Sequence, residues 1–171
     1  MNPDDTFLLF VTLMKVQAFR CPQKQKGAIY MVQIIAGGKG KGKTKILLDK
    51  VNTKVKESSG TLVYLDKNSK HMYELDRKVR LINVNDYCVT NYNEFIGFLC
   101  GMISQDHDLE TVYLDSFLSL ACVENTDIDI TPIIDKIDMI SAKFNVDFVI
   151  SMSKDKADLT ESVAQKVIVA L

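Results

Sequence analysis

The run Gly37–Thr44, which reads GGKGKGKT, constrains the fold of this 171-residue chain more than any other feature. It lies between a short β-branched run, Val32–Ala36, and a segment whose apolar residues recur at helical spacing from Ile46 to Val55. Glycines let the backbone turn sharply, and such a loop can direct successive N–H groups toward an anion. The arrangement therefore predicts a buried strand, an anion-binding loop and a helix, in that order.

The same run fits the pattern G-x-x-x-x-G-K-[ST], whose backbone cradles the phosphates of a nucleotide. In this pattern Lys43 reaches the terminal phosphates and Thr44 offers its hydroxyl to Mg²⁺. The helix that begins at Lys43 adds the positive end of its dipole. The alternative is a merely solvated loop of lysines and glycines. We expect the nucleotide-binding residues to be Gly37, Gly38, Lys39, Gly40, Lys41, Gly42, Lys43, Thr44 and Lys45.

Strand and helix signals alternate from Met31 to the end of the chain. This order is typical of an α/β fold with three α/β/α layers and a mainly parallel sheet. Ligands of such sheets bind at the carboxyl ends of the strands. The expected strands are 32–36, 61–65, 79–84, 111–114, 147–152 and 167–171; the expected helices begin at Lys43, at Asn91 or Asn93, at Thr131 and near Leu159, with a helical turn at 72–75.

The first thirty residues do not fit this alternation. The apolar stretch Phe7–Met14 follows Asp4 and Asp5, where a secretory signal would be positively charged. Codons for Lys26-Gly27-Ala28 can contain a purine-rich bacterial ribosome-binding sequence a few nucleotides before the codon for Met31. We expect residues 1–30 to be a non-native or poorly ordered leader, and residues 31–171 to be a single nucleotide-binding domain. An added helix packed on the domain is the alternative.

Composition gives little reason to expect a nucleic acid or a membrane as partner. Lys+Arg number 21 and Asp+Glu 22, so the net charge is −1, and the lysines near position 41 lack the aromatic or arginine neighbours that a nucleic-acid site needs. No apolar run approaches the roughly 18 residues of a membrane span. Four scattered cysteines, with no C-x-x-C pair, favour ordinary burial in a reducing compartment. We expect a cytoplasmic protein.

A second motif supplies a carboxylate. The apolar run Thr111–Leu114 is followed by Asp115, and in phosphate-loop proteins an acid in this position holds Mg²⁺, usually through water. A loop-capping Asp is the alternative interpretation.

Three segments, VQIIAGGKGKGKT, TLVYLDKNS and TVYLDSFLSL, resemble the RecA-like branch of the P-loop ATPases, which includes the KaiC-type and the secretion and pilus (PilT-type) motors. The resemblance extends from Val32 to about Leu120. It implies a three-layer α/β/α domain with a mainly parallel sheet, Mg²⁺ with ATP as the bound species, ATP hydrolysis, and assembly into rings or filaments. Ser151 and Ser153 lie at the end of the fifth expected strand, where the ATPases that this chain resembles have a polar residue that senses the γ-phosphate.

The resemblance also implies a water-activating glutamate just after the second strand. This region reads Asp66-Lys67-Asn68, with Asn68 near the expected position, and an amide can orient water but cannot accept its proton at neutral pH. Asp66 and Glu74 are the local substitutes, so the catalytic candidates are Lys43, Asp66, Asn68 and Glu74. An arginine finger would be Arg77 or Arg80, or would come from a partner.

Together these patterns predict an ATP-binding protein that uses Mg²⁺ and has weak or partner-dependent ATPase activity. It would work as a homo-oligomer or with a protein partner. A non-hydrolysing, nucleotide-responsive switch or adaptor is the alternative. A small phosphotransferase is a third possibility, and it would need an arginine-rich lid over the phosphates.

Overall fold

The computed structural model describes residues 31–171, so the expectation for residues 1–30 lies outside the described residues. Within that range six strands form one sheet in which every pairing is parallel. The strand order is β3-β2-β4-β5-β1-β6. The strands are β1 Val32–Ala36, β2 Thr61–Asp66, β3 Val79–Asn83, β4 Leu109–Leu114, β5 Asp147–Met152 and β6 Val167–Ala170.

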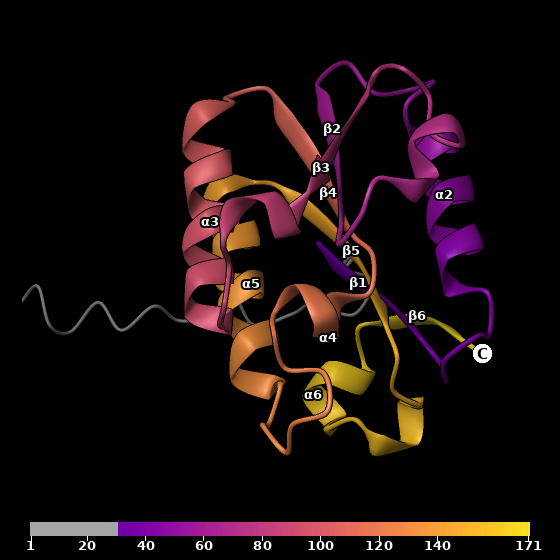
Figure 1. Cartoon of the computed structure of the whole chain (residues 1–171), viewed down its shortest axis with the longest axis vertical. Coiled ribbons are helices and arrows are strands. Elements are labelled where there is room, and N and C mark those ends of the chain that lie inside the picture. Colours follow the sequence, from indigo (N-terminus) through magenta and orange to yellow (C-terminus); the bar gives the residue numbers. More distant parts are fainter. Residues whose placement is uncertain (1–30) are drawn as a thin grey trace, which may run out of the picture.

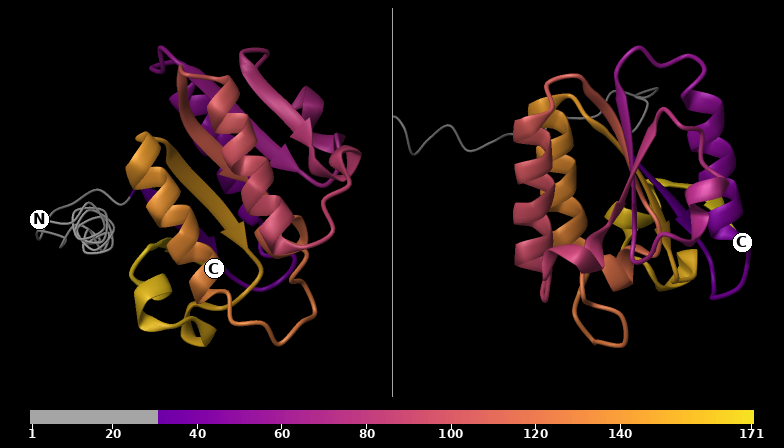
Figure 2. Two further views of the ribbon diagram at one scale, coloured as in Figure 1. Left: turned by 90° about the vertical axis from the view of Figure 1, so that its left-hand side faces the viewer. Right: turned by 45° about the horizontal axis from the view of Figure 1, so that its top comes forward.

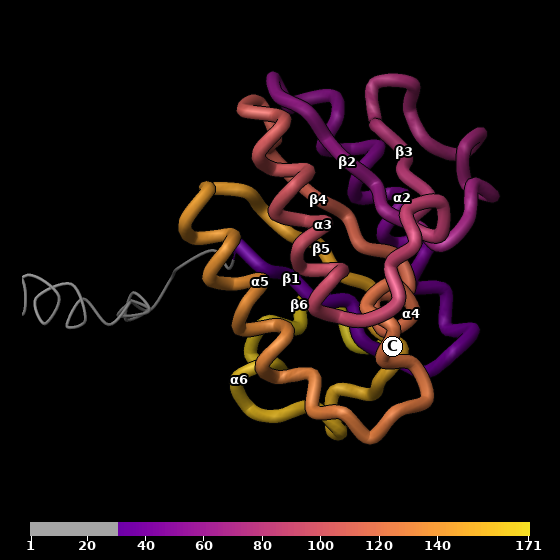
Figure 3. The backbone as a smooth tube through the Cα atoms, turned by 60° about the vertical axis from the view of Figure 1, so that its left-hand side comes forward, coloured from indigo at the N-terminus to yellow at the C-terminus, as the bar shows by residue number. Residues whose placement is uncertain are grey.

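Helices cover both faces of this sheet (Figure 1). Helix α2 (Lys43–Lys54) lies on one face, and α3 (Tyr92–Gln105) and α5 (Thr131–Phe144) lie side by side on the other (Figures 2 and 3). The result is the three-layer α/β/α architecture that the sequence predicted. The shorter elements are α4 (Phe117–Leu120), α6 (Glu161–Ala164) and the 3₁₀ turns η1 (Lys70–Tyr73), η2 (Val84–Tyr87) and η3 (Lys156–Asp158).

Burial on both faces explains why the strands are almost uniformly apolar. One buried cluster fills the space between the sheet and the α3–α5 layer, where Phe95, Phe117 and Phe148 are completely enclosed. A smaller cluster lies between the sheet and α2, and Tyr64 and Leu47 are enclosed there. The sheet is therefore the shared wall of two hydrophobic cores.

Some local expectations differ from the structure. The helix expected near Leu159–Ala164 is present as α6, whereas η3 before it and the turn at 117–120 that forms α4 were not expected. The expectation of buried cysteines is wrong for Cys88 and Cys122, which are exposed. Both have left-handed backbone, with φ of 54° and 55°, so they lie in turns, and neighbouring apolar residues do not determine which way a turn residue points.

No helix within residues 31–171 has the length and apolar character that crossing a membrane requires. Because all six strands run in the same direction, their carboxyl ends meet at one edge of the sheet. The loop after β1, the acid after β4 and the serines of β5 all lie at that edge, which is where the site is built.

Candidate functional site

The loop between β1 and α2 owes its shape to backbone that side chains rarely adopt. Gly40 and Gly42 have φ of 80° and 85°, and a Cβ at either position would meet nothing within 4 Å. Glycine is therefore needed here for conformation and not for space. Helix α2 starts directly after Gly42, which has no side chain to cap it, so the N–H groups of the first turn remain available to an anion.

Lys43 is buried, and its ammonium group is turned back into the loop. It donates to the carbonyl oxygens of Gly37 at 2.8 Å and Gly38 at 2.7 Å. An ammonium group has three protons to donate, so one remains for an incoming group. Burial lowers the pKa of Lys43, while the negative charges of Asp115 and Asp155 oppose that shift. An anion bound beside the lysine would compensate the cost of burying its charge.

Asp115, at the end of β4, is 2% exposed and is held by hydroxyl groups from three other elements. Its Oδ1 accepts from the Ser151 hydroxyl at 2.6 Å and from the Thr44 hydroxyl at 3.1 Å. Its Oδ2 accepts from the Tyr64 hydroxyl at 3.2 Å. Because the donors come from α2, β2 and β5, the carboxylate connects the last residue of the phosphate-loop motif, Thr44, to two strands of the sheet.

The donor set at this point fits Mg²⁺. The Thr44 hydroxyl points its proton at Asp115, so its oxygen lone pairs are free to face a cation. Mg²⁺ prefers oxygen ligands and is usually bound by one or two protein groups together with phosphates and water. The structure thus brings together Thr44 and Asp115, the two residues that the sequence predicts to bind magnesium.

A cleft of about 330 Å³ opens beside these residues. A volume of this size is at the lower end of the range for small-molecule sites. Ser151 and Ser153, the expected sensor residues, line it, although the Ser151 hydroxyl is already engaged with Asp115 and with the N–H of Ser116. The loop residues that line the cleft are Lys39, Gly40, Gly42, Lys43 and Thr44; Gly37, Gly38, Lys41 and Lys45 lie outside its lining.

Two residues at the site have no signal in the sequence. Glu124, in the loop after α4, lines the cleft, and its Oε1 lies 3.0 Å from Lys39 Nζ. That contact is the main reason why the pKa of Glu124 lies below its usual range. Tyr64 has the sequence context of an ordinary buried strand residue, yet its hydroxyl donates a hydrogen bond to Asp115. Both depend on contacts between distant segments, which a local pattern does not reveal.

The three water-activating candidates lie beside the cleft and not in its lining. Asp66 is buried at the end of β2, where burial raises its pKa; the N–H of Lys67 opposes that shift and Asp115 adds to it. The Asn68 side chain accepts from the N–H of Lys70 at 3.0 Å. Glu74 is exposed, and its Oε1 lies 2.7 Å from Nδ1 of His71. Their catalytic roles stay predictions.

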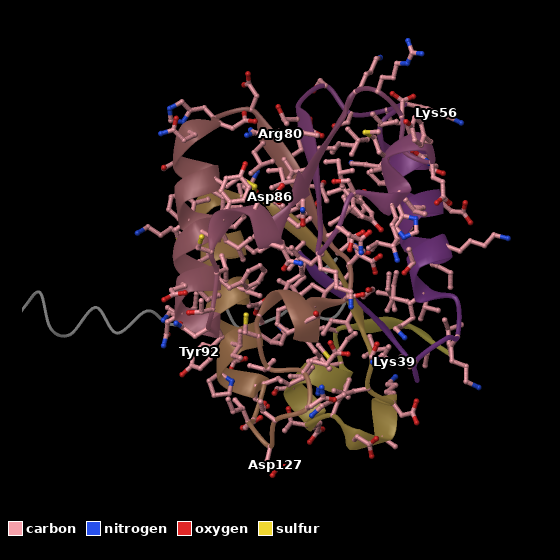
Figure 4. The ribbon with its side chains drawn as sticks, in the orientation of Figure 1. Lys39, Lys56, Arg80, Asp86, Tyr92 and Asp127 are labelled. Carbon is pink, nitrogen blue, oxygen red and sulfur yellow. The ribbon has the colours of Figure 1, made fainter. Side chains whose placement is uncertain are left out.

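Both arginines of the described chain are exposed, and neither lines the cleft. Arg80 is the second residue of β3, at the amino end of an edge strand, whereas the cleft lies at the carboxyl ends. Figure 4 shows Arg80 and Lys39 toward opposite ends of the molecule. Arg80 is therefore too far along the sheet to act on a ligand in the cleft of the same chain.

Comparison with known proteins supports the fold. A scan against protein-family models and a search of curated proteins gave no match. Among solved structures, the flagellar accessory protein FlaH from Methanocaldococcus jannaschii matches with a TM-score of 0.51 and 14% identity, over 78% of this chain and 65% of FlaH. PCH-2 of C. elegans aligns with a TM-score of 0.48 and 14% identity, over 96% of this chain and 41% of PCH-2.

The chain thus spans less than two thirds of either protein. At 14% identity, the match to FlaH concerns the fold alone. Taken with the parallel sheet and with the loop that joins β1 to α2, it shows that this chain has the α/β fold of the P-loop NTPases, as the sequence predicted.

Proposed function

We propose that this chain binds ATP with Mg²⁺ in the cleft at the carboxyl edge of the sheet. The observation that carries the proposal is the hydrogen bond from Thr44 to Asp115, residues 71 positions apart, directly beside the buried Lys43. A solvated loop of lysines and glycines would not need its lysine buried or its threonine joined to the acid of another strand. In a phosphate-binding loop, the lysine contacts the phosphates and the threonine hydroxyl contacts Mg²⁺, so both side chains belong beside the cleft.

Each residue has a definite part in this proposal. The N–H groups of the loop and of the first turn of α2 would bind phosphate oxygens, and Lys43 would donate its remaining proton to them. Thr44 and Asp115 would hold Mg²⁺, which supplies positive charge to the phosphates when it is bound. Ser151 and Tyr64 would keep the Asp115 carboxylate in position.

We infer that hydrolysis is slow or depends on another chain. The carboxylates that line the cleft, among the described residues, are Asp115 and Glu124, and Glu124 is paired with Lys39. Asp66 and Glu74 lie outside the lining, and both arginines are directed to solvent. A second copy of the chain, or a protein partner, would have to supply the arginine that stabilises the transition state.

Calorimetry with ATP and GTP, each with and without Mg²⁺, tests the binding proposal. We expect binding of ATP that is strengthened by Mg²⁺, and a loss of at least about tenfold in affinity for Lys43→Ala, since a charge-assisted contact contributes about 1.5–3 kcal/mol. Lys56→Ala is the matched control, because Lys56 is an exposed lysine beyond the far end of α2 (Figure 4). Absence of binding to either nucleotide would contradict the proposal.

Phosphate release separates a slow ATPase from the non-hydrolysing switch. A rate that exceeds that of Lys43→Ala supports hydrolysis by the chain itself. Equal background rates from the two proteins would leave nucleotide binding alone, as in the switch. If a partner copy supplies an arginine, the rate per chain should rise with protein concentration, and Arg77→Ala or Arg80→Ala should remove that rise.

A further inference from the structure

A cluster of three potential metal ligands lies behind the cleft. Asp66 at the end of β2, His71 in η1 and Asp115 at the end of β4 each place one ligand atom within 4.8 Å of the other two. Both aspartates are buried and His71 is half-buried. Of the three, Asp115 alone belongs to the lining of the cleft, so the cluster adjoins the proposed nucleotide site and shares Asp115 with it.

One atom of this cluster has no partner. Asp66 is 3% exposed, and its Oδ1 accepts the N–H of Lys67 at 2.7 Å. Its Oδ2 is buried without a hydrogen-bond donor among the described residues. A buried carboxylate oxygen without a donor is costly, and a second carboxylate beside it adds repulsion. A cation between Asp66 and Asp115 would remove both costs at once.

The histidine has one ring nitrogen engaged and the other available. Its Nδ1 lies 2.7 Å from Oε1 of Glu74, which leaves Nε2 as the nitrogen that can bind a metal. Histidine ligands of metals commonly have a carboxylate on the other ring nitrogen, because it fixes the ring and raises its basicity. The turn is anchored in addition: Asn52 of α2 donates to the carbonyl of Glu74 at 2.7 Å and accepts the N–H of Asp76 at 2.9 Å.

We propose that Asp66, His71 and Asp115 form a second cation site, which binds a divalent first-row transition ion such as Zn²⁺, Co²⁺ or Mn²⁺. An imidazole with two carboxylates suits these ions, whereas Mg²⁺ prefers oxygen ligands alone. Asp115 can take part because its Oδ2 accepts a single hydroxyl, from Tyr64, while Thr44 and Ser151 share Oδ1. This site requires no nucleotide, so it does not rest on the proposed function.

Binding would contract the cluster slightly. Zn²⁺ holds nitrogen and oxygen ligands at about 2.0–2.2 Å, so two ligand atoms of one ion lie at most about 4.4 Å apart. The required change is a few tenths of an ångström relative to the separation in the structure. The two or three remaining coordination positions would be filled by water.

Cobalt titration of the full chain without nucleotide tests this proposal. We expect one site with visible d–d absorption, and at least a tenfold loss of affinity in His71→Asn. The matched control is His107→Asn, since His107 is exposed and is the other of the two histidines in the sequence. With Mn²⁺ as the probe, the nitrogen coupling of an imidazole ligand in pulsed electron paramagnetic resonance should be present in wild type and in His107→Asn, and absent in His71→Asn.

Two further variants keep the outcome interpretable. Asp66→Asn, whose side chain has nearly the same shape, should also weaken cobalt binding at least tenfold while circular dichroism stays unchanged. Lys43→Ala, which should weaken nucleotide binding at least about tenfold, should bind cobalt no more weakly than wild type, so failure of the two proposals can be told apart. The proposal is overturned if cobalt binding is unaffected by His71→Asn, or if a thiolate charge-transfer band shows that cysteines hold the ion.

Discussion

At the scale of single residues, the site depends on one carboxylate. Asp115 accepts three hydroxyl groups, and the one from Tyr64 comes from inside the hydrophobic core on the α2 side. Burial, followed by the charge of Asp115, raises the pKa of Tyr64 far above its usual value. The phenol therefore keeps its proton at every physiological pH and is a permanent donor to Asp115.

Replacing Tyr64 with Phe should test the value of that donor. The substitution leaves Oδ2 of Asp115 without its hydroxyl partner, and hydrogen bonds to charged groups contribute about 1.5–3 kcal/mol. We expect urea denaturation to show a decrease of that size in the free energy of unfolding. Any Mg²⁺-dependent strengthening of ATP binding should also decrease.

Tyr113→Phe is the control for this change. Tyr113 is 2% exposed and its ring stacks on that of Tyr64, with 6.5 Å between the centroids. Burial raises its pKa to about 12, but its hydroxyl does not contact Asp115 among the hydrogen bonds of the described residues. An equal loss of stability in both variants would mean that the packing of the rings matters and the donor does not.

At the scale of elements, the sequence predicts what is local. The bounds of β1 and β5 and the first residues of α2 and α5 agree with expectation, because glycines, Pro132 and apolar runs mark them directly. The proximity of Thr44 and Asp115 was predictable from the phosphate-loop motif and the acid that follows an apolar strand. Tyr64 and Glu124 could not be predicted, because their contacts depend on strand order, and no local pattern says that β5 lies between β1 and β4.

A second carboxylate, at the opposite end of the sheet, links the turn before β2 to β4. Glu110 of β4 accepts the N–H of Gly60 at 2.8 Å and the hydroxyl of Ser59 at 3.1 Å, and it also accepts the hydroxyl of Ser58. These donors, with Ser58 first, hold the pKa of Glu110 below its usual range. The ionised form thus fixes the turn that leads into β2 against the start of β4.

The sign of the pH dependence follows from this lowered pKa. The ionised Glu110 contributes stability above the unfolded-state pKa of 4.5, and that contribution is lost as the pH falls through the folded-state pKa. Glu110→Gln should therefore be less stable than wild type at pH 7, and the difference should shrink below pH 4.5. Urea denaturation across this range measures it, with the exposed Glu57→Gln as control. A difference that is independent of pH would contradict the assignment.

The turn that carries His71 should depend on its anchor in α2. Asn52→Ala removes the contacts to Glu74 and Asp76, each of which is expected to contribute about 0.5–1.5 kcal/mol. Hydrogen exchange of peptides that cover residues 70–78 should accelerate about fivefold to a hundredfold, because local opening becomes easier. Thr53→Ala, which removes a bond to Asp49 within the same helix, should leave that segment unchanged. Equal exchange rates in Asn52→Ala and wild type would show that the turn is stable without its contacts to Asn52.

At the scale of the whole molecule, the site joins elements from both faces of the sheet. Lys43 and Thr44 start the helix that closes one core, while Asp115 leads directly into α4 of the other core. A ligand that contacts the loop and Asp115 therefore binds elements from both faces. Such a ligand stabilises the folded chain as a unit, because it binds the native state and not the unfolded one.

Because a ligand in the cleft binds elements from both faces, it should raise the melting temperature. ATP with Mg²⁺ at a hundred times the dissociation constant should add about 2.7 kcal/mol to the free energy of unfolding, and for a chain of this length that raises the midpoint by about 5–10 °C. At the same ATP concentration, Lys43→Ala should show about half of that rise or less, and Lys56→Ala should keep it. Cobalt alone should raise the midpoint in both variants, since His71 and Asp66 lie outside the phosphate loop. If Lys43→Ala responds to ATP as wild type does, the stabilisation comes from elsewhere on the molecule, and the cleft is not the nucleotide site.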